Sequence, residues 1–104
     1  MKEEYLHIPL NRNVEDERFE LTVEGYTAFI EYDEKEQGLR LLHTESPEEL
    51  AGRGVATALV EKTLVYLEGN NYKIVPLCQM VFAYIKKHPE WKRIVADDFL
   101  PRFH

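Results

Sequence analysis

The sequence has a single cysteine, no long apolar run and no excess of basic residues. Cys78 alone cannot form an intramolecular disulfide, which excludes the disulfide frameworks of small secreted domains. The first ten residues lack the apolar core of a secretion signal, so we expect a reducing, cytoplasmic location. The most apolar stretch, 74–85, is too short to span a bilayer, and Pro76 and Gln79 interrupt it. No membrane association is therefore expected.

The net charge of −6 is opposite in sign to that of a typical nucleic-acid-binding protein, so no nucleic-acid partner is predicted. An acidic surface attracts amines or lysine-rich segments, although it also serves solubility alone. The four histidines, at positions 7, 43, 88 and 104, show no metal-ligand spacing, and no metal site is predicted. The length of 104 residues predicts one domain, residues 1–104, with a modest core.

The first half of the chain has the alternating pattern of β-strands. Polar and apolar residues alternate over 19–23, and aromatic and β-branched residues are dense over 26–32. Gly25 between them predicts a tight hairpin turn. A polar turn over 33–38 then leads to a third strand, 39–45. We expect an antiparallel meander.

The second half changes to helical periodicity. Ser46 to Glu49 has the spelling of a capping box, which predicts Ser46 as the N-cap of a short turn. The apolar stripe over 56–67 predicts an amphipathic helix that ends at 69–71. A buried strand over 72–78 and a helix over 79–88 follow. Such a β-loop-α-β unit favours two parallel strands joined by a right-handed crossover.

Within the predicted strand 72–78, Pro76 marks a place where pairing with a neighbour stops, because proline cannot donate to a ladder. Pro89 ends the last predicted helix. Residues 1–17 and the tail from Trp91 onward carry no clear pattern.

The segment 51–56 (AGRGVA) follows a strand and opens a helix. Glycines let backbone N–H groups approach a ligand, and a helix N-terminus favours an anion, so a phosphate or pyrophosphate is the natural ligand. The alternative is a glycine turn that only starts the helix. The loop is neither a Walker loop nor a complete dinucleotide fingerprint, because Thr57 replaces the third small residue. Arg53, between the glycines, is the best candidate side chain for a phosphate.

The order of motifs resembles the GNAT acetyltransferase superfamily. Gly54-Val55-Ala56 matches its cofactor loop, although Ala51 stands where Gln or Arg is usual. The resemblance is closer to the minimal, single-domain branch of about a hundred residues, on four motifs. These are His43-Thr44-Glu45-Ser46-Pro47, Gly52-Arg53-Gly54, Val75-Pro76-Leu77-Cys78 and Tyr84-Ile85-Lys86-Lys87-His88-Pro89-Glu90-Trp91. The match covers about residues 18 to 91.

The resemblance implies an α+β (α/β layered) fold with a mixed, mainly antiparallel sheet, a splayed parallel strand pair and packed helices. The pantetheine arm of acetyl-CoA lies in the splay, and the loop amides bind the pyrophosphate. The implied cofactor-binding residues are Leu42, His43, Thr44, Gly52, Arg53, Gly54, Val55, Ala56, Thr57, Tyr84 and Lys87.

Three residues carry the implied chemistry. His43 is a general base for a direct attack, or it activates Cys78 as a nucleophile that takes the acetyl group covalently. Tyr84 is the acid that protonates the departing thiolate, and backbone amides near His43 and Thr44 polarise the acetyl carbonyl. The plain alternatives are that all three side chains serve packing, and that Lys87 belongs to a solvated helix face.

We therefore expect an acetyl-CoA-dependent acetyltransferase with an amine acceptor. The alternatives are a non-catalytic CoA-binding or acyl-CoA-binding module, and an interaction protein on the same scaffold. The full family fold continues with two further strands, whereas about a dozen residues follow Trp91 here. The acceptor side is thus expected to be open, or completed by a second copy, and both a monomer and a homodimer are compatible with the sequence.

Overall fold

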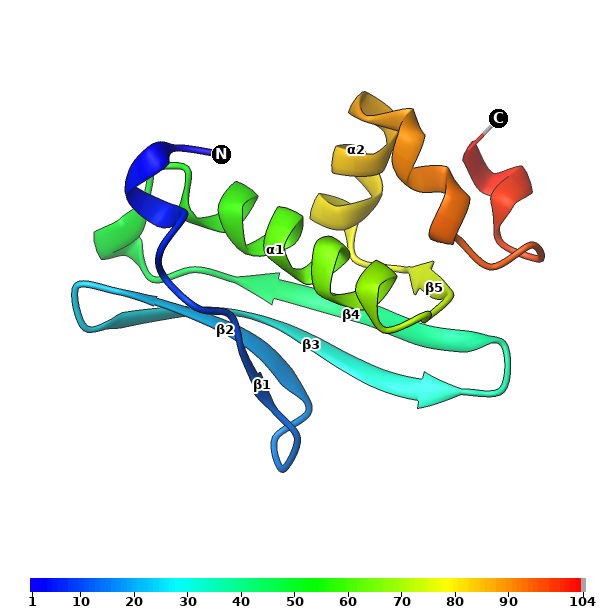
Figure 1. The fold of residues 1–104 in the computed structure, drawn as a ribbon, viewed down its shortest axis with the longest axis horizontal. Coiled ribbons are helices and arrows are strands. Elements are labelled where there is room, and N and C mark those ends of the chain that lie inside the picture. Colours follow the sequence, from blue (N-terminus) through cyan, green and yellow to red (C-terminus); the bar gives the residue numbers. More distant parts are fainter. Residues whose placement is uncertain (104) are drawn as a thin grey trace.

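A computed structural model describes residues 1–103 of the chain, and its elements form one mixed sheet with helices packed on it (Figure 1). The sheet has the strand order β1-β2-β3-β4-β5. Its first four strands are antiparallel, and β4 and β5 are parallel. The elements are β1 (Asn11–Asn13), β2 (Arg18–Val23), β3 (Tyr26–Lys35), β4 (Gly38–Glu45), α1 (Val55–Gly69), β5 (Ile74–Pro76) and α2 (Gln79–Lys87). The predicted α+β architecture, with its single parallel pair, is confirmed.

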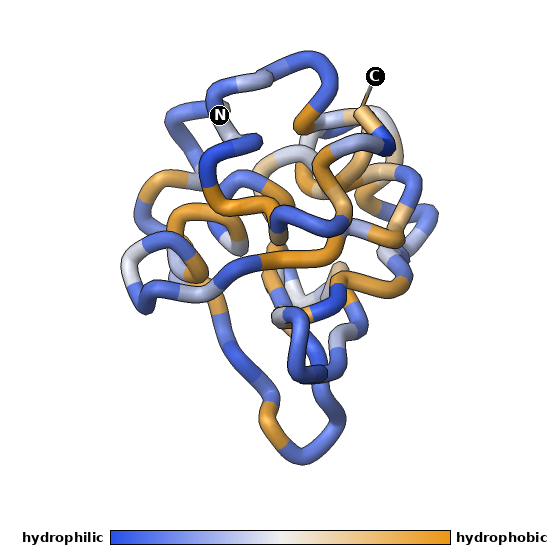
Figure 2. Tube along the Cα trace, turned by 90° about the vertical axis from the view of Figure 1, so that its right-hand side faces the viewer, coloured by the Kyte–Doolittle hydropathy of each residue, from blue (hydrophilic) through white to orange (hydrophobic). Residues whose placement is uncertain are grey.

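Both helices lie on the same side of the sheet (Figure 1). Alternate residues of β2, β3 and β4 face them and are fully buried, among them Phe19, Ile30 and Leu41. The apolar stripe of α1 meets this face through Leu59 and Leu64. Figure 2 shows the apolar segments gathered in the middle of the molecule. Within residues 1–103, no helix covers the opposite face of the sheet.

The β2–β3 hairpin turns as predicted. Glu24 and Gly25 both have positive φ, 54° and 84°, which is the requirement of a two-residue type I′ turn. The next hairpin differs from the prediction, because β3 continues to Lys35 where we expected a turn from Asp33. The bidentate pair between Asp33 and Arg40, with both contacts at 2.7 Å, extends the ladder across these polar residues. A hydropathy pattern does not predict that a strand continues through polar residues.

Three further boundaries need correction. Ser46 is not the N-cap of the next turn: Pro47 holds that position, no side chain caps it, and the turn is a 3₁₀ helix over Glu48–Leu50. The strand predicted over 72–78 is only Ile74–Pro76. Pairing with β4 ends at the Leu41–Pro76 pair, as the proline predicted. The unassigned ends form three further 3₁₀ helices, Glu3–Tyr5, Pro89–Ile94 and Leu100–Phe103.

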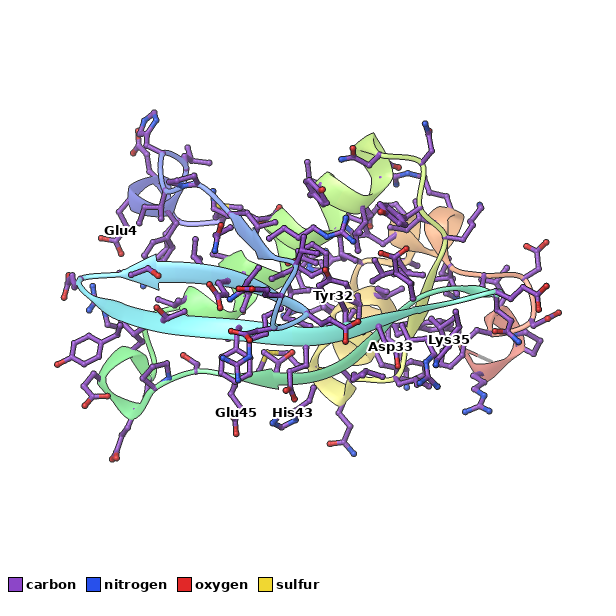
Figure 3. All side chains as sticks on the ribbon, turned by 90° about the horizontal axis from the view of Figure 1, so that it is seen from below. Glu4, Tyr32, Asp33, Lys35, His43 and Glu45 are labelled. Atoms are coloured by element: carbon purple, nitrogen blue, oxygen red, sulfur yellow. The ribbon has the colours of Figure 1, made fainter. Side chains whose placement is uncertain are left out.

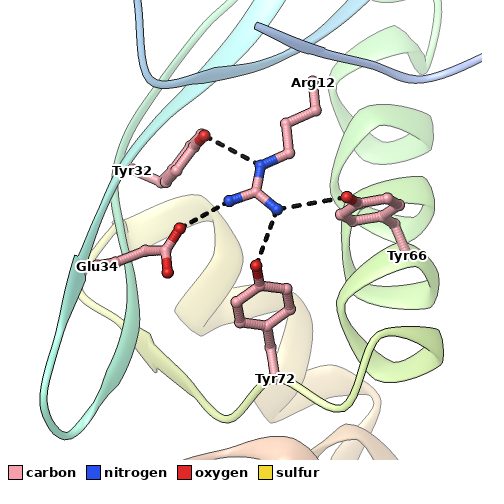
Figure 4. Close-up of polar contacts among 5 residues, drawn as sticks. All are labelled: Arg12, Tyr32, Glu34, Tyr66 and Tyr72. Atoms are coloured by element: carbon pink, nitrogen blue, oxygen red, sulfur yellow. Dashed lines mark hydrogen bonds and ion pairs between the residues drawn. The ribbon is translucent and has the colours of Figure 1, made fainter. Parts of the chain in front are cut away.

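One side chain of β1 joins β3, α1 and the loop between α1 and β5 (Figure 4). The Arg12 guanidinium donates to the hydroxyls of Tyr32 at 3.0 Å, Tyr66 at 3.3 Å and Tyr72 at 3.0 Å. It also forms an ion pair with Glu34 at 2.8 Å. Its carbon lies over the rings of the same three tyrosines, at 5.0 to 5.8 Å from their centroids. We call this cluster the Arg12 clasp.

Candidate functional site

The candidate site lies at the end of β4, which extends beyond its parallel neighbour β5. β4 continues to Glu45, but its pairing with β5 stops at Leu41. The last bond across the gap runs from the amide of Cys78 to the carbonyl of Leu41, at 2.8 Å. Residues 42–45 therefore have no strand on that edge within the described residues. Their backbone can pair with an extended ligand, as sheet edges do.

The same stretch of β4 contains a bulge. Its register against β3 shifts between Glu31, which pairs with His43, and Tyr32, which pairs with Leu41. Leu42 is thus the extra residue on β4. A bulge re-aims backbone groups and side chains at a strand edge, and bulges often lie beside functional sites. The amides near His43 and Thr44, predicted to polarise a carbonyl, follow this irregularity.

A cavity of about 740 Å³ opens beside the free edge. Its walls come from the end of β4 and the start of α2. Leu42, His43, Thr44, Leu77, Cys78, Gln79, Met80 and Ala83 line it. The structure therefore brings the predicted residues His43, Thr44 and Cys78 to one cavity. Leu77 and Met80 are exposed to 41% and 44%, which makes part of the wall apolar and accessible.

Cys78 is only 6% exposed and lies directly before α2, at its N-cap. Its sulfur lies 3.0 Å from the hydroxyl oxygen of Thr44. The sequence predicted Cys78 beside His43, whereas the hydrogen-bond partner of Cys78 in the structure is Thr44. The first turn of α2 contains no acidic residue, so the helix dipole is not opposed at this end.

A second cavity, of about 580 Å³, lies beside the first and on the sheet face that no helix covers. Thr27, Phe29, His43, Thr44, Glu45, Ser46 and Pro47 line it. His43 and Thr44 belong to both cavities. Figure 3 shows His43 and Glu45 side by side along β4, and the His43 Nε2 lies 3.3 Å from the Glu45 carboxylate. Both side chains are more than half exposed, so the contact places a carboxylate beside the imidazole without burying either group.

The glycine loop forms a third cavity, of about 300 Å³, at the N-terminus of α1. Gly52 and Gly54 have positive φ, 74° and 77°, so glycine is required by conformation at both positions. The lining includes the predicted cofactor residues Gly52, Gly54, Val55, Ala56 and Thr57. Ser46 and Pro47 line both this cavity and the second one, so the two cavities adjoin at these residues.

Arg53 does not point a free guanidinium at the loop. Both of its terminal nitrogens donate to the Glu24 carboxylate, at 3.0 and 2.8 Å. Hydrogen bonds from Arg53 hold the pKa of Glu24 below its ordinary value. The carbonyl of Arg53 accepts a bond from the buried Tyr5 hydroxyl at 2.7 Å. The residue therefore ties the loop to the β2–β3 turn and to the N-terminal 3₁₀ helix.

Tyr84 and Lys87 lie outside the residues that line these cavities. Tyr84 is half-buried on α2, and its ring packs on His88 with centroids 4.5 Å apart. Burial, with the nearby carboxylates of Glu61 and Glu90, raises the pKa of Tyr84 above its ordinary value. Lys87 is exposed in the last turn of α2, at the opposite end of the helix from Cys78.

Sequence reasoning assigned no role to Glu45, nor to lining residues such as Leu77 and Met80. Glu45 belongs to the motif His43-Thr44-Glu45. The signal that could have found it is strand alternation, because His43 and Glu45 lie on one face of β4 and Thr44 lies on the other.

No group of three metal-ligating side chains occurs in residues 1–103. Among the helices of these residues, none has the length and apolar character needed to cross a membrane.

A glycine loop before a helix, beside a parallel strand pair that opens at its carboxyl ends, is the layout of a protein that binds a ligand in the crevice at the strand ends. The family model described as GCN5-related N-acetyl-transferase matches residues 18–94, which is about three quarters of the chain. The chain therefore belongs to the GCN5-related N-acetyltransferase family, a family of acyltransferases. No curated protein matches the chain.

Proposed function

We propose that this protein binds acetyl-CoA and transfers the acetyl group to an amine. The observation that carries the proposal is the free edge of β4 over residues 42–45, beside the cavity that His43 and Cys78 line and a few residues before the glycine loop. Pantetheine contains two amides, and a sheet edge offers them backbone partners. Amides of the loop, at a helix N-terminus with no acidic residue in its first turn, suit the pyrophosphate.

The two adjoining cavities support a division of roles. The larger one, between β4 and α2, suits the acyl end of the cofactor, because its wall includes the apolar Leu42, Leu77 and Met80. The second, on the uncovered sheet face, suits the acceptor. It contains the Glu45 carboxylate and no lysine or arginine, so it favours a cationic group such as an ammonium. His43 and Thr44 stand at the boundary between the two.

When bound, acetyl-CoA supplies a thioester: the bond from carbonyl carbon to amine nitrogen forms as the carbon–sulfur bond breaks. His43, oriented by Glu45, accepts the proton of the amine. The amides that follow the β4 bulge stabilise negative charge on the acetyl oxygen. The departing sulfur takes its proton from solvent at the open cavity, because Tyr84, the predicted acid, lines neither cavity.

Transfer in this proposal is direct, and Cys78 forms part of the wall. Two observations support this over a covalent intermediate on Cys78. The thiol is 6% exposed and engaged by Thr44, whereas the His43 side chain is 55% exposed at the boundary of the two cavities. A base that takes a proton from an incoming amine must be reached by that amine, and His43 meets this requirement.

Calorimetric titration with acetyl-CoA tests the proposal, on the wild type and on Gly54→Glu. We expect binding by the wild type and none by the variant, because a side chain at Gly54 is strained and places a carboxylate at the anion site. Gly25→Glu is the matched control, since Gly25 has a similar φ of 84° but lines none of the three cavities. A folded wild type that binds neither acetyl-CoA nor CoA contradicts the proposal.

A further inference from the structure

The N-terminal segment lies against the glycine loop, outside the part of the chain that the family model covers (Figure 1). Tyr5 is 1% exposed, and its hydroxyl bonds to the carbonyl of Arg53. Within the 3₁₀ helix, the amide of Tyr5 donates to the carbonyl of Lys2 at 3.0 Å. These two bonds fix the backbone of Lys2 relative to the loop.

The Lys2 side chain extends over Gly54. A Cβ on Gly54 would lie 3.6 Å from Cε of Lys2 and 3.9 Å from its Cδ, so the alkyl chain passes at van der Waals distance over the residue that caps α1. The ammonium is thereby brought to the edge of the loop. No carboxylate of residues 1–103 forms an ion pair with Lys2, whereas the Arg53 guanidinium is engaged by Glu24.

We infer that Lys2, and not Arg53, is the cationic side chain that binds the pyrophosphate of the cofactor. The inference rests on the proposed function, because it assigns a ligand to the same loop. The loop amides bind the phosphate, and the side chain that adds most to them is a cation that lies within reach and is not already paired. Lys2 meets both conditions. Arg53 would first have to leave a bidentate carboxylate partner. The Arg53–Glu24 pair then has the role of holding the loop in place.

The test compares calorimetric titrations with CoA on four proteins. Lys2→Met keeps the alkyl chain over Gly54 and removes the charge. We expect its dissociation constant for CoA to rise about fivefold to tenfold, as for the loss of one charge-assisted contact. Lys35→Met is the matched control at the opposite end of the sheet, as Figure 3 shows, and it should change the constant less than twofold. The double variant Glu24→Gln/Arg53→Gln frees the loop from the β2–β3 turn but keeps Lys2, so it should raise the constant by less than Lys2→Met does.

Shorter ligands identify the phosphate. With 3′-dephospho-CoA, the ratio between Lys2→Met and the wild type should equal that found with CoA, because the pyrophosphate is retained. A ratio that falls to one with 3′-dephospho-CoA places Lys2 at the 3′-phosphate and overturns the inference. CoA affinity within twofold of the wild type for Lys2→Met also overturns it. A wild type that binds no CoA overturns the proposed function itself, so the two failures are distinct.

Discussion

The hydroxyl oxygen of Thr44 lies 3.0 Å from the sulfur of Cys78, across the gap where β4 and β5 separate. The contact connects the last strand of the antiparallel meander to the residue before α2. It is a side-chain link just beyond the last backbone bond across the gap, which runs from the Cys78 amide to the Leu41 carbonyl. Successive residues at the end of β4 therefore face different sites. Thr44 faces the gap, and His43 and Glu45 face the uncovered side of the sheet.

Loss of the Cys78 thiol is expected to leave acetyl transfer largely intact. In the proposed direct route no bond to sulfur forms on the enzyme, so Cys78→Ala should keep kcat/KM within about threefold of the wild type. Intact-protein mass spectrometry after incubation with acetyl-CoA, without acceptor, should find no acetylated Cys78. An acetyl group on Cys78, together with an inactive Cys78→Ala variant, would instead establish the covalent route.

His43 is expected to dominate the chemistry, with Glu45 acting through it. His43→Gln should lower kcat/KM about 100-fold, in the range of general-base catalysis, as measured by CoA thiol release with a primary amine acceptor. Glu45→Gln should lower kcat about tenfold and leave the KM for acetyl-CoA unchanged. The double variant should be no slower than His43→Gln alone. Independent, multiplying effects of the two substitutions would show that Glu45 does not act through His43.

Replacing the planar guanidinium group of Arg12 should destabilise the fold without affecting cofactor binding. Arg12→Lys keeps the charge but cannot donate to three tyrosines and Glu34 at once. We expect the free energy of unfolding in urea to fall by about 2 kcal/mol, and by about 1 kcal/mol for Tyr72→Phe. Arg102→Lys, on the C-terminal 3₁₀ helix, is the control and should change it by less than about 0.5 kcal/mol. Equal free energies of unfolding for Arg12→Lys and the wild type would show that the clasp does not stabilise the fold.

Two glycines should respond in opposite directions to alanine. At Gly38, with φ of 153°, a Cβ would lie 2.6 Å from the carbonyl oxygen of Lys73, so Gly38→Ala should lower the free energy of unfolding by about 2 kcal/mol. At Gly69, the last residue of α1, a Cβ meets nothing within 4 Å. Gly69→Ala should raise the free energy of unfolding by about 0.5 kcal/mol, because alanine favours the helix. Chemical denaturation measures both, and a stable Gly38→Ala variant would contradict the close backbone approach.

Local signals in the sequence predicted most of the fold. The β2–β3 turn required a residue that tolerates positive φ, and Gly25 identified it. Pro76 placed the end of the parallel pairing to the residue. The boundary at Asp33 was wrong because the stabilising partner, Arg40, stands on another strand, and a window of sequence does not reveal which carboxylates find an arginine.

The site was predicted as a set of residues but not as a set of contacts. His43, Thr44 and Cys78 do share a cavity. Their partners depended on a one-residue bulge at Leu42, which decides the face on which each following side chain lies. The pairing of Arg53 with Glu24, and the approach of Lys2 to Gly54, join segments that sequence spacing does not relate.

The Arg12 clasp also bears on how quickly the native state is lost. Its bonds to Tyr66 and Tyr72 join residues 54 and 60 positions apart, so a long loop must close before either forms. We expect contacts of this kind to form after the folding transition state, which a φ-value near zero for Tyr72→Phe would show. In that case the clasp slows unfolding far more than it speeds folding, and it gives kinetic persistence to a sheet that is covered by helices on one side only.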